Sequence, residues 1–380
     1  MVGAGYVGCA TALALEALGW SVCLQSPHSL GAQPDPNWDL RVFTISPGNE
    51  RLLDILGVWQ HLDAARLSPV YKMEVAGDGG RGSLEFDAMA AGVSHLATVV
   101  EGGRLQAAME ARLHARGGVR VEVGEIADLT WSHDKVVSKL RDGRAITGKL
   151  VCGADGADSQ VRTRAGIALR QRGYGQQGVV ANFRAQKAHR GRAFQWFRPD
   201  GVLALLPLPG HLLSMVWSTD DAHARELCAH DPGQLAAQVA AASQGVLGEL
   251  EALSPARAFP LRYGRADPIV GHRVVLLGDA AHCVHPLAGQ GVNLGLRDVS
   301  DLGDYLKEHR YDADVAASGR LGGFENRRRS DILAVMALTD GLHRLFAGTH
   351  PILRRMRTDG MRAVNELSML KRALIQHAMS

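Results

Sequence analysis

Three glycines near the N-terminus have the spacing of a phosphate-binding turn. Gly3, Gly5 and Gly8 form the pattern G-x-G-x-x-G, and apolar residues at helical spacing follow directly. Glycine here permits a tight turn, close approach of the backbone to a pyrophosphate, and close packing of helix on strand. Unpaired N–H groups at the start of the helix attract the phosphates. The pattern therefore predicts a dinucleotide site, with Val7 in the same turn.

Two features of this segment depart from the usual dinucleotide-binding pattern. The next strand normally ends in an acidic residue that binds ribose hydroxyls, whereas this chain has Gln25. An amide can accept one such hydrogen bond without a charge, a loss of about 1 kcal/mol. Only Met1 and Val2 precede Gly3, although a buried strand of about 4–8 residues is expected there. We therefore expect the natural chain to begin further upstream, which an intact-mass measurement would test.

A second glycine cluster, residues 153–159, contains Asp155 and follows the apolar pair Leu150 and Val151. A strand that ends in a Gly/Asp turn is common in proteins of every kind. Both interpretations, a cofactor contact and an ordinary turn, are open from these residues alone.

The third glycine cluster is the most specific of the three. Gly278 and Asp279 follow the apolar run 274–277, so the Asp279 carboxylate can accept a hydrogen bond from a ribose or ribitol hydroxyl. The turn around Gly289 and Gly291 presents backbone N–H groups, and a helix is expected to begin near Asn293. Such a site suits a group that becomes negative during reaction, such as a reduced flavin. The candidate residues of this cluster are Gly278, Asp279, Pro286, Gly289, Gly291, Val292 and Asn293.

Two other kinds of chemistry are not supported by the same segment. His282 and His285 lie three residues apart near Asp279, but no further ligand has matching spacing, so no metal site is predicted. Cys283 is expected to be an inert small apolar residue and not a nucleophile.

Composition excludes several classes of protein. The 380 residues are 46% hydrophobic, and 42 basic against 39 acidic residues give a net charge of +3. These values exclude a disordered chain and give no indication of a nucleic-acid partner. Five cysteines without a CxxC pair fit a reducing compartment, and no apolar run is long enough to span a membrane. We expect a cytoplasmic protein, with peripheral attachment to the inner membrane as an alternative.

Apolar periodicity predicts alternating helices and strands, interrupted by an antiparallel region. Helices are predicted at 48–57 and 104–116, and strands at 21–25, 119–123, about 135–140, and 274–277. Strong turn signals separate three further strands at 193–198, 202–208 and 212–218, which indicates an antiparallel meander. The last fifty residues are predicted to be helical and basic. They fit either a packing helix with a solvated face or contact with an anionic membrane or a partner protein.

The order and spacing of the three clusters resemble the single-component, FAD-dependent aromatic hydroxylases of the p-hydroxybenzoate hydroxylase type. Residues 285–298 (HPLAGQGVNLGLRD) resemble more narrowly the hydroxylases of ubiquinone biosynthesis. Shorter segments that agree with this resemblance lie at 39–42, 56–59, 203–208, 339–346, 370–372 and 378–379.

The resemblance implies an α/β fold in which a Rossmann-like FAD-binding domain of three-layer β-β-α character is interleaved with an antiparallel-sheet substrate domain. The FAD-binding domain would comprise 1–70, 101–172 and 263–330. The substrate domain would comprise 71–100 and 173–262, and C-terminal helices would occupy 331–380.

The resemblance also implies roles for individual residues. The G-x-G-x-x-G turn would contact the ADP half of FAD, and Asp279 the ribityl and ribose region. Asp155 would lie where FAD and the nicotinamide cofactor approach, Arg41 near the flavin, and the backbone of Ile126 near the adenine. Pro286 and residues 289–293 would line the isoalloxazine. The family commonly has Glu-Asn-Arg where this chain has Glu-Gly-Gly-Arg at 101–104, so no role is assigned to Arg104.

The implied activity is an NADPH- or NADH-dependent monooxygenase that hydroxylates the ring of a polyprenyl-phenol ubiquinone precursor through a flavin C4a-hydroperoxide. No catalytic acid or base stands out. Two alternatives stay open: a related flavin hydroxylase of another aromatic substrate, and a weakly flavin-binding, non-catalytic scaffold of a ubiquinone-synthesis complex. The ring position, the tail length, the choice between NADH and NADPH, and the oligomeric state have no readable signature.

Overall fold

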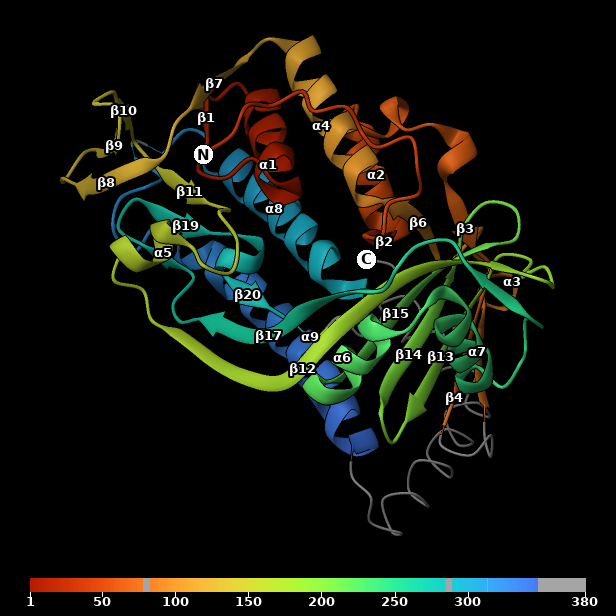
Figure 1. The fold of residues 1–380 in the computed structure, drawn as a ribbon. Coiled ribbons are helices and arrows are strands. Elements are labelled where there is room, and N and C mark those ends of the chain that lie inside the picture. The colour runs from red at the N-terminus through yellow and green to blue at the C-terminus, as the bar shows by residue number, and fades with distance from the viewer. Residues whose placement is uncertain (78–82, 285–288, 313, 348–380) are drawn as a thin grey trace.

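The computed structural model describes residues 1–77, 83–284, 289–312 and 314–347. A parallel sheet and its helices form one half of the molecule, and a large, mostly antiparallel sheet forms the other half (Figure 1). The long strands β12 (Leu169–Ala185) and β17 (Arg257–Ala266) connect the two halves.

The parallel sheet is built from short strands, which are buried at its centre and partly exposed at its edges. Its order is β7 (Val119–Val123), β1 (Val22–Ser26), the bridge residue Val2, β11 (Val151–Gly153), β19 (Val274–Leu276) and, antiparallel to β19, β18 (Val270–Gly271). Val2 donates to the Cys152 carbonyl, and the Gln25 N–H donates to the Met1 carbonyl. Residues 1–3 therefore occupy the central position between β1 and β11.

Helices cover one face of this sheet and an antiparallel layer covers the other. The helices are α1 (Tyr6–Ala17), α4 (Gly102–Arg116) and α8 (Gln290–Glu308), and α1 packs against both of the others. The antiparallel layer consists of β8 (Ile126–Trp131), β9 (Val136–Leu140) and β10 (Ala145–Gly148). Buried side chains from all three layers share one hydrophobic core, which confirms the predicted β-β-α character.

A small antiparallel sheet lies between the two halves. It pairs β2 (Val42–Ile45), β6 (Ala97–Glu101) and β3 (Ser68–Val70). Helix α2 (Pro47–Ile55) follows β2 because Ser46 caps it and Pro47 begins it. Short elements nearby are η1 (Trp59–His61), η2 (Ala64–Arg66) and α3 (Ala88–Ala91).

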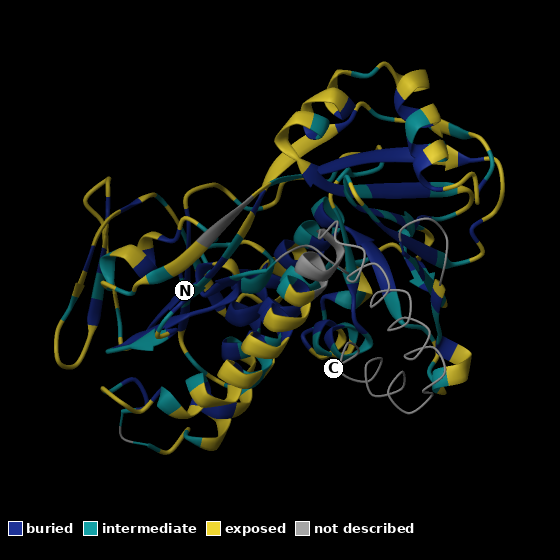
Figure 2. Cartoon of the chain, turned by 90° about the horizontal axis from the view of Figure 1, so that it is seen from below, coloured by how far each residue is buried: buried dark blue, intermediate teal, exposed yellow. Residues whose placement is uncertain are grey.

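The large sheet contains the predicted meander. Strands β13 (Arg192–Arg198), β14 (Gly201–Pro207) and β15 (Leu212–Asp220) pair in antiparallel succession, so this prediction is confirmed. The sheet extends from β4 (Lys72–Ala76) and β5 (Ser83–Asp87) at one edge to β20 (His282–Cys283) at the other, and β16 (Leu250–Ala252) pairs with β12. Helices α6 (Asp221–Ala229) and α7 (Pro232–Ala242) cover one face and bury its strands (Figure 2).

The remaining helices end the described chain. Helix α5 (Gln160–Arg164) follows β11, η4 (Gly278–Ala280) follows β19, and α9 (Gly322–Ala347) packs against α8. The helix predicted near Asn293 begins three residues earlier, at Gln290, because Gly289 supplies a left-handed N-cap. Residues 348–380 and Pro286 lie outside the described part of the chain. None of the helices described has the length and apolar character needed to cross a membrane.

Candidate flavin site

The three glycines of the first turn have different structural roles. Gly3 has a φ of +96°, and a Cβ there would lie 2.4 Å from the Ala154 carbonyl oxygen. A Cβ on Gly8 would lie 1.8 Å from the Gly3 carbonyl oxygen, so only glycine lets α1 pack on the turn. Gly5 has open space around its Cβ position, and as N-cap of α1 it has no side-chain cap. The turn therefore leaves the first N–H groups of α1 available to a pyrophosphate.

Val7 joins this turn to the third glycine cluster. Added Cβ atoms at Gly278 and Gly295 would lie 3.0 Å and 2.6 Å from the Val7 side chain. Gly278 also has a φ of +57°. The first turn of α1, the turn after β19 and helix α8 therefore meet at one valine, which places two predicted cofactor-binding clusters side by side.

Asp279 lies beside this junction, in the short helix η4 that follows β19. Solvent reaches its side chain, yet protein closely surrounds it. This partial desolvation raises the pKa of Asp279 above its ordinary value, although the charges of His282 and Arg41 oppose the rise. The carboxylate has no hydrogen-bond partner among the described residues, so it is available to ligand hydroxyl groups.

Arg41 is near enough to Asp279 to act on its pKa, and it lies against two aromatic rings. Its guanidinium carbon is 5.6 Å from the ring centre of Tyr6 and 5.2 Å from that of Phe43. The two rings contact each other edge to face at 4.9 Å. Tyr6 and Phe43 could not be predicted as site residues, because their contact with Arg41 depends on β2 lying beside the start of α1.

The turn before α8 closes the site from the side of β2. Gly289 has a φ of +65°, and an added Cβ would lie 2.2 Å from the Thr44 hydroxyl oxygen. Gly291 has open space at its Cβ position, as Gly5 has. Val292 is buried in the shared core. The backbone at Gly291 is thus accessible to a ring system, while Gly289 is held tightly against the protein.

Asn293 holds this turn against β2 with its whole side chain. Its Nδ2 donates to the carbonyls of Thr44 (2.7 Å) and Gly289 (3.2 Å), and its Oδ1 accepts from the N–H of Ser46 (3.0 Å) and from Asn49 Nδ2 (2.9 Å). The Asn293 amide is buried and its hydrogen bonds are all to protein groups. Asn293 therefore positions the turn and β2, and it offers no hydrogen bond of its own to a ligand.

Asp155 has a local structural contact for each carboxylate oxygen. Oδ2 accepts from the N–H groups of Gln160 (2.7 Å) and Val161 (3.1 Å), and Oδ1 accepts from the Ser159 hydroxyl (2.5 Å). These contacts cap α5, which agrees with the interpretation of the cluster as an ordinary turn. A role of Asp155 toward the nicotinamide stays a prediction.

Gln25 and Ser26 share the end of β1. Gln25 Nε2 donates to the Gly124 carbonyl, whereas its Oε1 is buried and has no partner among the described residues. Ser26 is the last residue of the strand, and its hydroxyl donates to the His28 carbonyl at 2.7 Å. The strand thus ends one residue later than the sequence argument assumed, and Ser26 is an additional candidate for the ribose. Ile126 is buried at the start of β8, and its backbone contact with adenine stays a prediction.

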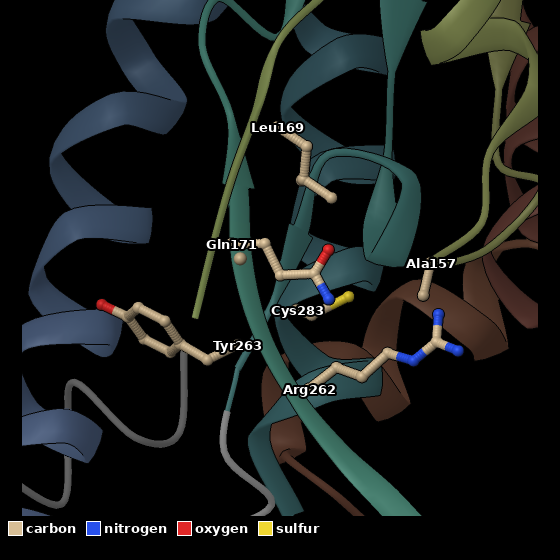
Figure 3. Close-up of a pocket in the computed structure, with 7 residues that line it drawn as sticks. Ala157, Leu169, Gln171, Arg262, Tyr263 and Cys283 are labelled. Carbon is tan, nitrogen blue, oxygen red and sulfur yellow. The ribbon is translucent and has the colours of Figure 1, made fainter. Parts of the chain in front are cut away.

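A small open pocket lies next to the turn that carries Asp279 (Figure 3). Its lining residues are Ala157, Leu169, Gln171, Arg262, Tyr263, Gly264 and Cys283. Arg262 pairs with Asp158 at 2.5 Å. Burial raises the pKa of the Cys283 thiol to about 12, and nearby Asp279 adds to this, so Cys283 is not a nucleophile at neutral pH. Among the described residues, no group of three His, Cys, Asp or Glu side chains could hold a metal ion.

The geometry fits FAD. An uncapped helix start beside an open glycine suits the pyrophosphate, a solvent-accessible carboxylate without a protein partner suits the ribityl hydroxyls, and the buried, partnerless Gln25 Oε1 can accept from a hydroxyl. The accessible backbone at Gly291, at the uncapped start of α8, suits a ring that gains negative charge. These features together indicate an FAD-binding site.

Comparison with known proteins supports FAD binding and identifies the family to which this chain belongs. The family model described as "FAD binding domain" matches residues 1–337. The chain is 35% identical to ubiquinone hydroxylase UbiL of Rhodospirillum rubrum, over 100% of this chain and 88% of the relative. It is also 35% identical to 3-demethoxyubiquinol 3-hydroxylase of Escherichia coli, over 100% and 97%. The chain belongs to the family of FAD-dependent hydroxylases of ubiquinone biosynthesis.

The solved structures show the same fold at lower sequence identity. The structure of p-nitrophenol 4-monooxygenase from Pseudomonas putida has a TM-score of 0.80 and 18% identity, and it covers 100% of this chain and 97% of its own. The likeness confirms the predicted fold class.

Proposed function

We propose that this chain hydroxylates the aromatic ring of a polyprenyl-phenol precursor of ubiquinone, with O₂ as oxygen donor and NADPH or NADH as reductant. Full-length similarity to hydroxylases named for ubiquinone precursors is the observation that carries the proposal.

FAD supplies the redox and oxygen chemistry of this class when it is bound. The residues of the chain bind and orient it: Gly5 leaves the backbone N–H groups of α1 to the phosphates, and Asp279 accepts from hydroxyl groups. The backbone around Gly291 faces negative charge that develops during reaction. No described side chain is assigned as a catalytic acid or base.

The large sheet offers an apolar surface on the side of the flavin site, interrupted by the polar side chains of Asn182, Gln195 and Ser214. Its face opposite α6 and α7 packs against Trp38 and Val42, which flank Arg41. Ala204, Leu206 and Val216 point to this face by strand alternation and are only partly buried. Such a surface can hold an aromatic ring and the start of an isoprenoid tail while excluding water. A long tail would bring the protein to a membrane surface, for which the basic C-terminal residues are suited.

The test is turnover by the purified, FAD-loaded chain. We expect NADPH or NADH oxidation to accelerate when a prenylated phenol is added, and the product to be heavier by one oxygen atom. Tail-less phenols provide the control for the contribution of the apolar surface.

Two results would contradict the proposal in different ways. A flavin-loaded protein that responds to non-prenylated aromatics alone would be a related hydroxylase of another substrate. A folded protein that binds no FAD would be a scaffold, because the open positions at Gly5 and Gly291 would then have no ligand.

A further inference from the structure

Asp298 of α8 holds both ends of the turn that presents Asp279. It is fully buried, and its Oδ2 accepts from the Gly278 N–H at 2.8 Å and from His282 Nε2 at 2.7 Å. Since a carboxylate only accepts at these positions, His282 carries its proton on Nε2. The Asp298 carboxylate therefore holds Gly278, the first residue of η4, and His282, the first residue of β20.

Arg328 of α9 holds Asp298 from the other side. Its side chain is 2% exposed, and Nε donates to Asp298 Oδ1 at 2.8 Å. Its NH1 lies 2.8 Å from both Asp301 Oδ2 and Asp331 Oδ2, and NH2 donates to the Leu294 carbonyl at 3.4 Å. The planar guanidinium thus donates to the carboxylates of Asp298 and Asp301 and forms an ion pair with Asp331, an arrangement that a lysine ammonium cannot reproduce.

The charges of this cluster keep Asp298 ionised. Burial alone would raise the pKa of Asp298, but the neighbouring His282 and Arg328 outweigh burial and hold the pKa below its ordinary value. The three hydrogen bonds to the carboxylate are therefore charge-assisted, and the turn from Gly278 to His282 has little freedom to move.

We propose that Arg328 is a positioning residue for the flavin site, which acts through Asp298 to fix the turn that carries Asp279. Arg328 belongs to α9, and among the described residues it makes no hydrogen bond with the turns of the glycine clusters, so sequence spacing gives no sign of this role. The inference rests on the binding of FAD beside Asp279.

The alternative is that the cluster only stabilises the packing of α9 on α8. The two roles separate in the apoprotein, because a purely stabilising residue changes unfolding but leaves the FAD affinity of the folded protein unchanged. Arg328→Lys keeps a cation near Asp301 and Asp331 while it removes the Nε donor to Asp298. Arg329, the next residue on α9, is exposed and provides the matched control.

The experiment measures FAD dissociation constants by fluorescence titration of apoprotein, together with urea unfolding midpoints, for Arg328→Lys, Arg328→Met, Arg329→Lys and Arg329→Met. Residues that orient the groups of a binding site typically change its affinity about tenfold or more when they are mutated, so we expect Arg328→Lys to weaken FAD binding about tenfold. Arg328→Met should weaken it further, and both Arg329 variants should bind as wild type does. The circular dichroism of bound flavin should also change in Arg328→Lys alone among the lysine variants.

Unchanged FAD affinity in Arg328→Lys, whatever its unfolding midpoint, would overturn the inference. Equal weakening in Arg329→Lys would overturn it as well. A wild-type chain that binds no FAD would overturn the proposed function together with this inference, so the two failures are distinguishable.

Discussion

The loops after β11 and β19 bring an aspartate to the same edge of the parallel sheet, but the two carboxylates have different surroundings. Asp155, after β11, accepts three hydrogen bonds from the start of α5. Asp279, after β19, has none from the described residues and is open to solvent. The glycines differ in the same way: Gly8 is in contact with backbone, whereas Gly5 borders open space. Groups that the fold itself satisfies support the site, and groups that it leaves unsatisfied are available to a ligand.

The largest effect is expected where a substitution disrupts a close contact within the fold, and this effect is on stability. Gly8→Ala would force a Cβ to within 1.8 Å of the Gly3 carbonyl oxygen. Because this oxygen belongs to the backbone and cannot turn aside as a side chain could, we expect a loss of about 3 kcal/mol of stability, from the upper range for overpacking. Urea unfolding of the apoprotein measures this loss.

Gly5→Ala is the matched control for this prediction. Its φ of −76° suits alanine and no atom lies near the new Cβ, so the apoprotein should unfold as wild type does. The methyl group would instead meet the phosphates and weaken FAD binding about tenfold or more. Equal destabilisation by the two substitutions would break the comparison.

Asp279→Asn should affect FAD binding more than the stability of the folded protein. The amide can still accept a hydrogen bond but loses the charge, a loss of about 1 kcal/mol, so we expect FAD affinity to fall about fivefold. Fluorescence titration of the apoprotein with FAD measures the change. Retention of full affinity would show that the free carboxylate of Asp279 does not serve the flavin.

Asp155→Asn should show the reverse behaviour. Loss of the carboxylate at the start of α5 is expected to cost about 1 kcal/mol of stability, since capping contacts have this size. The FAD dissociation constant should change less than in Asp279→Asn. A larger effect on FAD binding than on unfolding would assign Asp155 to the cofactor after all.

The smallest expected effect is a difference in pH dependence. The pKa of Asp279 is raised above 3.8 in the folded protein, so between these two values the folded state binds more protons than the unfolded state. This carboxyl therefore lowers stability as pH rises through that window, and its contribution is constant above it. The stability of apo Asp279→Asn relative to wild type should grow over the same window and then level off, as measured by urea unfolding at several pH values. A difference that shrinks with rising pH would contradict the desolvation of Asp279.

Local patterns in the sequence predicted the parts of the fold that depend on local physics. The turns at 199–201 and 209–210 and the alternation around them gave the meander to within one or two residues. The glycine spacing gave the turn before α1, because the backbone there allows no other residue at Gly3 and Gly8.

Contacts between segments that are far apart in the sequence could not be predicted from local patterns. The contact of Arg41 with the Tyr6 ring requires β2 to lie beside α1. The hydrogen bond from Arg328 to Asp298 joins two helices across 30 residues of sequence. Gln25 was assigned to the end of its strand because a period of two does not mark where a strand stops, and β1 continues to Ser26.

The most direct test of the central claim is the origin of the oxygen atom in the product. FAD-loaded protein, NADPH or NADH, a prenylated phenol and isotopically labelled O₂ should yield a ring-hydroxylated phenol that carries one labelled atom. Fully flavin-loaded protein that gives no product, or a product without the label, would contradict the account.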